Sequence, residues 1–357
     1  MLLLAAFPSG CMGPGPIEAV PWDPPPRPAF EGVFAPNHDL ESATLIAEGQ
    51  LDRPEDVAVD TSDPARPIYA GGPGGKVVRI DWAPGKPATV TPIATLGGTL
   101  PLGLKFDGQG ALLVANPGVG LQAVDVHAPG HPVTLLTDTV GDRKLRFLND
   151  LDVAKDGTVY FSESSANYGV EGLGPLYAIL AHRADGGLFA YDPKRHATRQ
   201  LLDGLYFPNG VTVTSDQASV LVAETGLYAI TRYRLIDGQR EPFASNMPGI
   251  PDGIMSDGKG TIWVACSGPR SALLDFCGPL PWVRNLAARL PDAALQNLAV
   301  GEAYGLLLAY DEHGRPTRSL HDRTGRFVGG IANAEPADGK LYLGTIFGHH
   351  VGVVAQP

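Results

Sequence analysis

One short pattern recurs along this chain and constrains its fold more than any other feature. A proline or another apolar anchor stands before a single residue, and a short alternating strand follows. The clearest copy is the turn Pro208-Asn209-Gly210, which leads into a β-branched strand over residues 211–214. The anchors are Pro54, Pro101, Leu148, Pro208, Pro251 and Ile331.

Most anchors lie ~40–50 residues apart, with about four short strands in each interval, which is typical of a β-propeller blade. The composition agrees, because 45 glycines and 33 prolines among 357 residues, with charged residues at only 18%, favour short strands joined by turns. The sequence therefore predicts an all-β fold, a six-bladed β-propeller of four-stranded antiparallel blades over residues 37–357. A leftover strand at residues 43–47 is expected to close the ring by joining the last blade.

Two intervals are longer and mark insertions, over residues 165–186 and 268–304. In the second, Trp282, Leu286 and Leu290 recur at every fourth position, which predicts a short helical insertion in blade five with one apolar face. Such an insertion stands on one face of the disc. It would form a lid, touch a membrane, or pack its apolar face against the blade below, and packing is the simplest of the three.

The first 36 residues form a lead that is apolar and then rich in proline. Residues 1–7 are apolar but far short of the ~20 residues that span a bilayer, and no basic segment precedes them as in a secretory signal. They are either the remnant of an export signal or anchor, which implies a periplasmic or membrane-associated protein, or a disordered cytoplasmic tail. Membrane association would run through this N-terminus or through the insertion at residues 273–290.

The net charge and the cysteine content limit the classes of molecule that this chain can bind. The net charge of -11, with no basic cluster, argues against nucleic acid. The cysteines Cys11, Cys266 and Cys277 form no metal-binding pattern. Cys266 and Cys277 can pair only if the segment between them folds back on itself. We expect a monomer that acts on a small molecule.

The residues directly after the anchors occupy one level of the propeller if the repeats are equivalent, and they converge on its central channel. They are Glu55, Leu102, Asn149, Asn209, Asp252 and Ala332. Four of them offer side-chain oxygens, and unpaired carboxylates in such a channel would repel one another and cost several kcal/mol of desolvation. A bound cation removes that cost.

Two carboxylates, Glu55 and Asp252, balance a divalent ion, and Asn149 and Asn209 add neutral oxygens. The ring contains no His or Cys, which favours hard cations, and irregular coordination by 6–8 oxygens favours Ca²⁺ over Mg²⁺. Four side chains leave positions for water or substrate, which allows Lewis-acid chemistry. The alternative is turn chemistry, since Pro-Asn-Gly and Pro-Asp-Gly are ordinary turn sequences. It accounts for Asn209 and Asp252 but poorly for Glu55.

Longer motifs around these residues resemble the strictosidine synthase-like family, within the six-bladed propeller group of gluconolactonases, paraoxonases and diisopropyl-fluorophosphatase. The similar motifs are FLNDLDV (147–153), LDGLYFPNGV (202–211), LVAETG (221–226), MPGIPD (247–252), LDF (274–276) and SLHD (319–322). The resemblance runs from residue 55 to about residue 354 and implies a six-bladed propeller. It also implies that a Glu, two Asn and an Asp hold a catalytic calcium ion, and those roles fall on Glu55, Asn149, Asn209 and Asp252.

Two departures from the family pattern matter. Relatives often carry Asn after the aspartate, whereas this chain has Gly253, so one amide ligand is missing. In true strictosidine synthases a catalytic Glu lies just before the last inner strand, where this chain has Ala332, with Glu335 as the nearest carboxylate. Without that group a Pictet–Spengler condensation lacks its proton shuttle, which disfavours a strictosidine synthase-type condensation here.

We therefore expect a calcium-dependent hydrolase of lactones or aryl esters, with Asp252 activating water or attacking the carbonyl carbon. His321 and His349, in the closing blades, are the other candidates for a catalytic base. The candidate substrate-binding side chains are Phe147, Tyr206, Phe207 and Trp282. The rival from another class is a non-catalytic binding scaffold, in which the metal ion only stabilises the blades.

Overall fold

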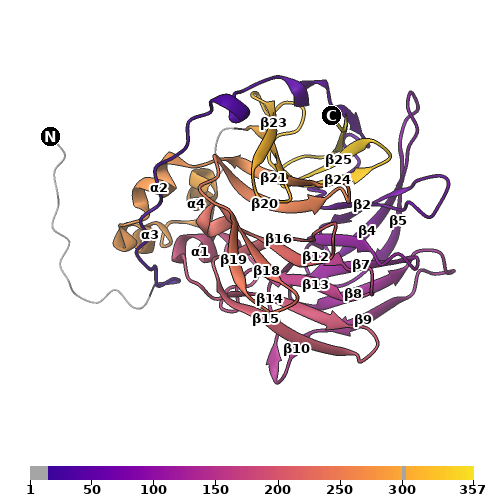
Figure 1. Cartoon of the computed structure of the whole chain (residues 1–357), viewed down its shortest axis with the longest axis horizontal. Helices are drawn as coiled ribbons and strands as arrows, with labels where there is room; N and C mark the ends of the chain where they lie inside the picture. Colours follow the sequence, from indigo (N-terminus) through magenta and orange to yellow (C-terminus); the bar gives the residue numbers. More distant parts are fainter. Residues whose placement is uncertain (1–14, 300–302) are drawn as a thin grey trace.

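The strands form six four-stranded antiparallel sheets arranged as the blades of a propeller (Figure 1). The computed structural model describes residues 15–299 and 303–357. Within a blade, strands that follow one another in the sequence pair with one another. The first strands of neighbouring blades are in contact all the way round, from β2 through β6, β12, β16, β20 and β24 back to β2. The predicted all-β, six-bladed propeller is confirmed.

The blades follow one another in chain order. Blades one and two consist of β2 (Val57–Val59), β3 (Ile68–Gly72), β4 (Lys76–Asp81), β5 (Thr89–Thr95), and of β6 (Gly103–Phe106), β7 (Ala111–Asn116), β8 (Gly120–Asp125), β9 (Val133–Thr137). Blades three and four consist of β12 (Leu148–Val153), β13 (Val159–Glu163), β14 (Gly186–Asp192), β15 (Ala197–Leu205), and of β16 (Pro208–Val213), β17 (Ser219–Glu224), β18 (Ala229–Arg234), β19 (Arg240–Ala244). Blades five and six consist of β20 (Gly249–Ser256), β21 (Thr261–Pro269), β22 (Gly305–Asp311), β23 (Pro316–Asp322), and of β24 (Ile331–Ala337), β25 (Lys340–Thr345), β26 (Val351–Ala355) and β1 (Thr44–Ile46). The hairpin of β10 (Thr139–Val140) and β11 (Arg143–Lys144) connects blades two and three.

Ring closure uses the first strand of the chain. β1 pairs antiparallel with β26, with Leu45 opposite Gly352. The last blade therefore takes three strands from the C-terminal end and one from the N-terminal end, as the leftover strand at residues 43–47 predicted. This pairing ties the two ends of the propeller together.

The innermost and second strands are almost completely buried, and their sequences are correspondingly apolar. All six residues of β17 are buried, as are those of β16. The sequence did not locate the outermost strands of blades one, two, four and five. In β9 no residue is fully buried, and a strand that packs so little needs no regular apolar alternation, so the sequence signal is weak.

The helices gather at one end of the propeller (left in Figure 1). α1 (Gly174–Ala181) joins the second and third strands of blade three, and α2 (Ala272–Cys277), α3 (Pro281–Ala287) and α4 (Asp292–Ala299) join those of blade five. In an antiparallel meander the turn after the second strand lies at the end where the first strand begins. We call this end of the propeller the mouth face.

The predicted helical insertion in blade five is present, but its apolar face does not pack on the blade below. Trp282 is 66% exposed and Leu286 52% exposed, and Leu290 is also exposed. Instead, α3 buries Arg284, which donates hydrogen bonds to the carbonyl oxygens of Leu180 and Gly278 at 2.8 and 2.9 Å. The packing interpretation of residues 282, 286 and 290 is therefore wrong.

Residues 15–36 form a largely irregular strap across the molecule, with one short turn, η1 (Gly32–Phe34). Val20 N–H donates to the Ala181 carbonyl at 2.9 Å, and the Ser319 hydroxyl donates to the Val33 carbonyl at 2.8 Å. The predicted export-signal or anchor remnant and Cys11 lie outside the described residues. Cys266 and Cys277 are both buried free thiols, so they do not pair. In the described part of the chain no helix is long and apolar enough to cross a bilayer.

The inner strands approach one another so closely that side chains are excluded at several points of contact. A Cβ atom on Gly210 would lie 2.3 Å from Ile254 N and 2.6 Å from the Asp252 carbonyl oxygen. Neighbouring blades are also linked by side-chain carboxylates, because Asp150 accepts a hydrogen bond from Val211 N–H at 2.8 Å. Asp56 does the same for Leu104 N–H at 2.5 Å.

Gly210→Ala should destabilise the propeller by about 2–4 kcal/mol or prevent folding, because the new methyl group meets backbone atoms that belong to the next blade. Gly268→Ala is the matched control, since a Cβ there meets no atom within 4 Å. Its free energy of unfolding should stay within about 0.5 kcal/mol of the parent. Denaturant unfolding of both variants measures this, and equal stabilities would contradict the close approach of the inner strands.

Candidate metal centre

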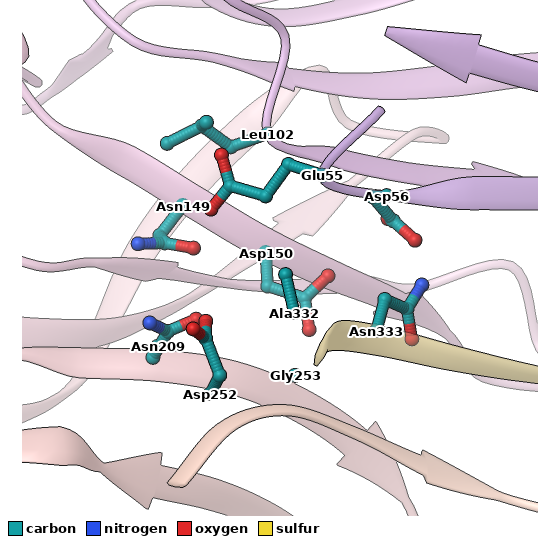
Figure 2. A pocket seen from close by; sticks show the side chains of 10 residues that line it. All are labelled: Glu55, Asp56, Leu102, Asn149, Asp150, Asn209, Asp252, Gly253, Ala332 and Asn333. Carbon is teal, nitrogen blue, oxygen red and sulfur yellow. The ribbon is translucent and has the colours of Figure 1, made fainter. Parts of the chain in front are cut away.

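The six residues that follow the anchors meet at one small cavity on the propeller axis (Figure 2). Each lies shortly before an inner strand or in its first half, so the repeat places all of them at one level. The cavity is lined by Glu55, Asp56, Leu102, Asn149, Asp150, Asn209, Asp252, Gly253, Ala332 and Asn333. The structure therefore brings together the whole ring that the repeat predicted.

The four oxygen-bearing side chains of the ring face one another. Figure 2 shows Glu55, Asn149, Asn209 and Asp252 directed toward the same part of the cavity. The Asn149 amide nitrogen donates to the Ser164 hydroxyl at 2.9 Å, and that hydroxyl donates to the Pro208 carbonyl at 2.8 Å. Because its nitrogen is held by Ser164, Asn149 is free to present its Oδ1 atom to the cavity.

The carboxylates in this ring are in an unfavourable environment. Burial raises the pKa of Glu55 well above its ordinary value, and the charges of Asp252 and Asp150 add to the rise. Burial also raises the pKa of Asp252 to about 7; the Asn209 amide opposes this rise, and the Asp150 charge adds to it. Within the described chain no group donates a hydrogen bond to the Glu55 carboxylate. Such concentrated negative charge is an environment in which a cation would lower the pKa of both acids.

The donor set fits a hard divalent cation. It consists of carboxylate and amide oxygens, which are typical ligands of Ca²⁺. The cavity volume is about 10 Å³, which is room for one water-sized sphere. In residues 15–299 and 303–357 no three His, Cys, Asp or Glu side chains are close enough to one another to hold a metal ion. The ring is not a cluster of that kind, because two of its four donors are asparagines.

A second polar layer lies beside and below the ring, and sequence reasoning missed it. Asp56, Asp150 and Asn333 directly follow ring residues, and the Asn333 amide nitrogen is buried without a hydrogen-bond partner. Further along the inner strands, the Lys105 ammonium lies 3.0 Å from the Glu335 carboxylate. The sequence feature that could have indicated this pair is the lysine in the otherwise apolar inner strand 103–106, because a buried charge needs a partner of opposite charge.

An apolar cluster stands over the ring at the mouth face. Phe147 and Phe207 form an edge-to-face pair with ring centroids 5.6 Å apart, and they pack with Leu102 and with Ala178 of α1. Two of the predicted substrate-binding side chains are therefore next to the ring, but they are buried beneath α1. Tyr206 is turned to the side, where its ring lies 4.8 Å from that of His182.

Three other predicted site residues are not at the ring. Trp282 lies on the exposed face of α3. His321 is fully buried on β23, the outermost strand of its blade, and its two ring nitrogens are bonded to the Tyr304 and Ser319 hydroxyls. His349 lies exposed in the turn before β26, with Nδ1 3.1 Å from the Leu51 carbonyl oxygen. His321, a candidate base from the sequence, therefore lies on the outermost strand of its blade and away from the ring.

The chain matches the family models for strictosidine synthase over residues 149–238 and for the strictosidine synthase-like N-terminal region over residues 32–80. It is 35% identical to adipocyte plasma membrane-associated protein of Salmo salar, over 89% of this chain and 79% of that one. It is 31% identical to the protein of that name in Homo sapiens, over 92% and 82% of the two chains. Protein strictosidine synthase-like 7 of Arabidopsis thaliana is 29% identical, over 87% and 81%.

Solved structures share the fold at lower identity. A gluconolactonase from Xanthomonas campestris superimposes with a TM-score of 0.61 at 21% identity, covering 97% of this chain and 99% of the other. A regucalcin from Agrobacterium tumefaciens, described as a calcium-binding protein, gives 0.58 at 14% identity, over 87% and 92%. At these identities the similarity establishes the architecture.

Stripped of divalent ions by a chelator, the protein should become less stable as the pH rises from about 5 to 8. The pKa values of Asp252 and Asp150 are raised to about 7 in the folded state. Between their ordinary pKa and about pH 7 the folded protein therefore holds more protons than the unfolded chain, and the free energy of unfolding falls as the pH rises through this range. Calcium should restore a few °C of melting temperature, more at pH 8 than at pH 5, because protons compete with the ion.

Differential scanning fluorimetry with and without calcium checks this. Asp252→Asn removes one of the buried charges and should flatten the dependence on both pH and calcium. Identical melting temperatures with and without calcium at every pH would contradict a cation site in this ring.

Proposed function

The chain belongs to the strictosidine synthase-like family, and on that premise we propose that it is a calcium-dependent hydrolase of lactones or aryl esters. The observation that carries the proposal is the convergence of Glu55, Asn149, Asn209 and Asp252 on one cavity at the propeller axis. Four protein side chains fall short of the 6–8 oxygens that Ca²⁺ takes. The remaining positions are where a substrate carbonyl and a water molecule would be held. Mg²⁺ is the second choice of ion.

A bound calcium ion would supply a Lewis acid for the substrate carbonyl oxygen. The chain's own residues do the rest. Glu55 and Asp252 balance the charge, and the Asn149 and Asn209 amides place neutral oxygens without excess charge. Asp252 accepts the proton of the water that attacks the carbonyl carbon and returns it to the alkoxide that leaves as the acyl C–O bond breaks; alternatively its carboxylate attacks, the alkoxide leaves, and water then hydrolyses the acyl intermediate. Phe147 and Phe207, next to the ring, exclude bulk water from the reacting groups.

Substrate entry requires a movement at the mouth face. A cavity of about 10 Å³ accepts an ion or a water molecule but no ester. The cover is the apolar cluster in which Ala178 of α1 packs against Phe147 and Phe207. A shift of α1 away from Phe147 and Phe207 would give a substrate access to the ring of oxygen donors. These two aromatic side chains would then form walls of the substrate pocket.

The names of the structural neighbours support the same reading. One is a gluconolactonase and another a calcium-binding regucalcin, and both share this propeller architecture. Fold similarity alone does not determine an activity, so the main support for the proposal is the set of four oxygen donors in the ring. A strictosidine synthase-type condensation is disfavoured, because Ala332 stands at the position of the acid–base group and Glu335 is bound to Lys105.

The small size of the cavity also favours a second candidate, a non-catalytic binding scaffold. In that case calcium stabilises the packing of the inner strands and α1 does not move. The two insertions would then bind a partner. The two candidates differ in turnover, because a scaffold binds the ion without hydrolysing any ester.

Membrane association is a further part of the proposal. The relatives from Salmo salar and Homo sapiens are named plasma membrane-associated proteins. In this chain the contact would be made by the N-terminal segment or by residues 273–290, and the protein would then be periplasmic or membrane-associated. We also propose that it is a monomer.

Purified protein should hydrolyse aryl esters or lactones, lose this activity with a chelator and regain it with calcium. Asp252→Ala should lower kcat/KM by about 10³-fold or more, since both an ion ligand and the proposed base are lost. Asp203→Ala is the control, because Asp203 is an exposed carboxylate on β15, and it should stay within about twofold of the parent.

His349→Ala separates the remaining candidate base from Asp252. Full activity in His349→Ala together with loss in Asp252→Ala supports the assignment. Hydrolytic activity that is retained in the presence of a chelator and in Asp252→Ala would contradict the proposed mechanism. No turnover, with a melting temperature that calcium still raises, would favour the scaffold.

A further inference from the structure

The α2–α3 segment places apolar side chains outward and charged side chains inward. Each exposed residue between positions 272 and 288 is apolar: Ala272, Leu273, Phe276, Pro279, Trp282 and Leu286. Phe276 is 71% and Trp282 66% exposed. The two charged side chains of the segment are bound inside, Arg284 to backbone carbonyls and Asp275 to Arg270 at 3.1 Å. A surface that only faces water has the opposite arrangement.

The N-terminal strap reaches the described part of the chain beside this surface. Gly15 lies against the Arg289 side chain, and Ala19 N–H donates to the Asn285 side-chain oxygen of α3 at 2.9 Å. Seven residues separate this point from the apolar sequence at residues 1–7.

The surface belongs to the mouth face of the propeller. α3 contacts α1, which covers the ring, and the Arg284 guanidinium joins the two through the Leu180 carbonyl at 2.8 Å. Figure 1 shows α2 and α3 at the edge of the molecule, on the same side as α1. By contrast, Ile236 is 88% exposed in the turn between β18 and β19, which lies at the opposite end of the blades.

We propose that Leu273, Phe276, Trp282, Leu286 and Leu290 form a docking surface that inserts into the interface of a zwitterionic lipid bilayer. The docked orientation turns the mouth face and its ring toward the lipid. Tryptophan, phenylalanine and leucine are the side chains that bind at this depth. Between residues 272 and 290 every exposed side chain except Arg289 is apolar, whereas a protein interface would carry a polar rim.

Charge decides the kind of lipid. The chain carries a net charge of -11, which opposes an anionic membrane, so the surface fits a phosphatidylcholine interface. The apolar sequence at residues 1–7 offers a second weak anchor, and two weak anchors hold a protein more firmly than one. This inference rests on the proposed membrane association but not on hydrolysis.

The test is sedimentation of the full chain with phosphatidylcholine vesicles. The parent protein should bind, and Phe276→Asp/Trp282→Asp should lower the bound fraction about tenfold or more. Ile236→Asp is the control, since it places a negative charge on an exposed apolar position at the opposite end, and it should bind within about twofold of the parent. Circular dichroism and melting temperature verify that each variant is folded.

Trp282 also reports insertion directly. Its fluorescence should be quenched by brominated phosphatidylcholine, and Trp282→Phe should lose that part of the quenching. Failure of the parent to bind vesicles would overturn the proposal. Binding that survives the double substitution would overturn this surface while leaving association through residues 1–14 intact. Self-association that the double substitution abolishes, with no vesicle binding, would assign the surface to a second copy of the chain.

Discussion

Close packing of six inner strands around one axis is the constraint on which the rest of the structure depends. Their backbones approach until only glycine fits at Gly103, Gly210 and Gly253. The same approach lets Asp56 and Asp150 accept hydrogen bonds from the backbone of the next blade. The contacts that join the blades therefore also concentrate negative charge at the axis.

That charge is only partly compensated by the protein itself. Lys105 neutralises Glu335 further along the channel, but the half-buried Glu55 and the buried Asp252 lie together at the ring, with pKa values raised by desolvation and by neighbouring carboxylates. A divalent cation held by these acids and by the two amides would join four blades at one point. In the proposed function the same ion serves stability and catalysis, and α1 controls which molecules reach it.

The repeat in the sequence was sufficient to predict the six blades, the closing strand and the ring, because each depends on a short local pattern at regular spacing. It was insufficient for features that depend on which strand or face is outermost. His321 lies in a family-like motif, yet it is on the outer strand β23. Trp282, Leu286 and Leu290 have the spacing of a buried helix face, and that face is exposed because Arg284 occupies the inner side. The same apolar pattern is compatible with packing on a blade or on lipid, and only the three-dimensional position distinguishes the two.

The most direct test of the account is isothermal titration of calcium into chelator-treated protein at pH 8. One ion per chain should bind in the ring, and this binding should be lost in Glu55→Gln and in Asp252→Asn, while Asp203→Asn should bind calcium as the parent does. No calcium binding by the parent, or binding that persists unchanged in both ring variants, would contradict the cation site at the propeller axis.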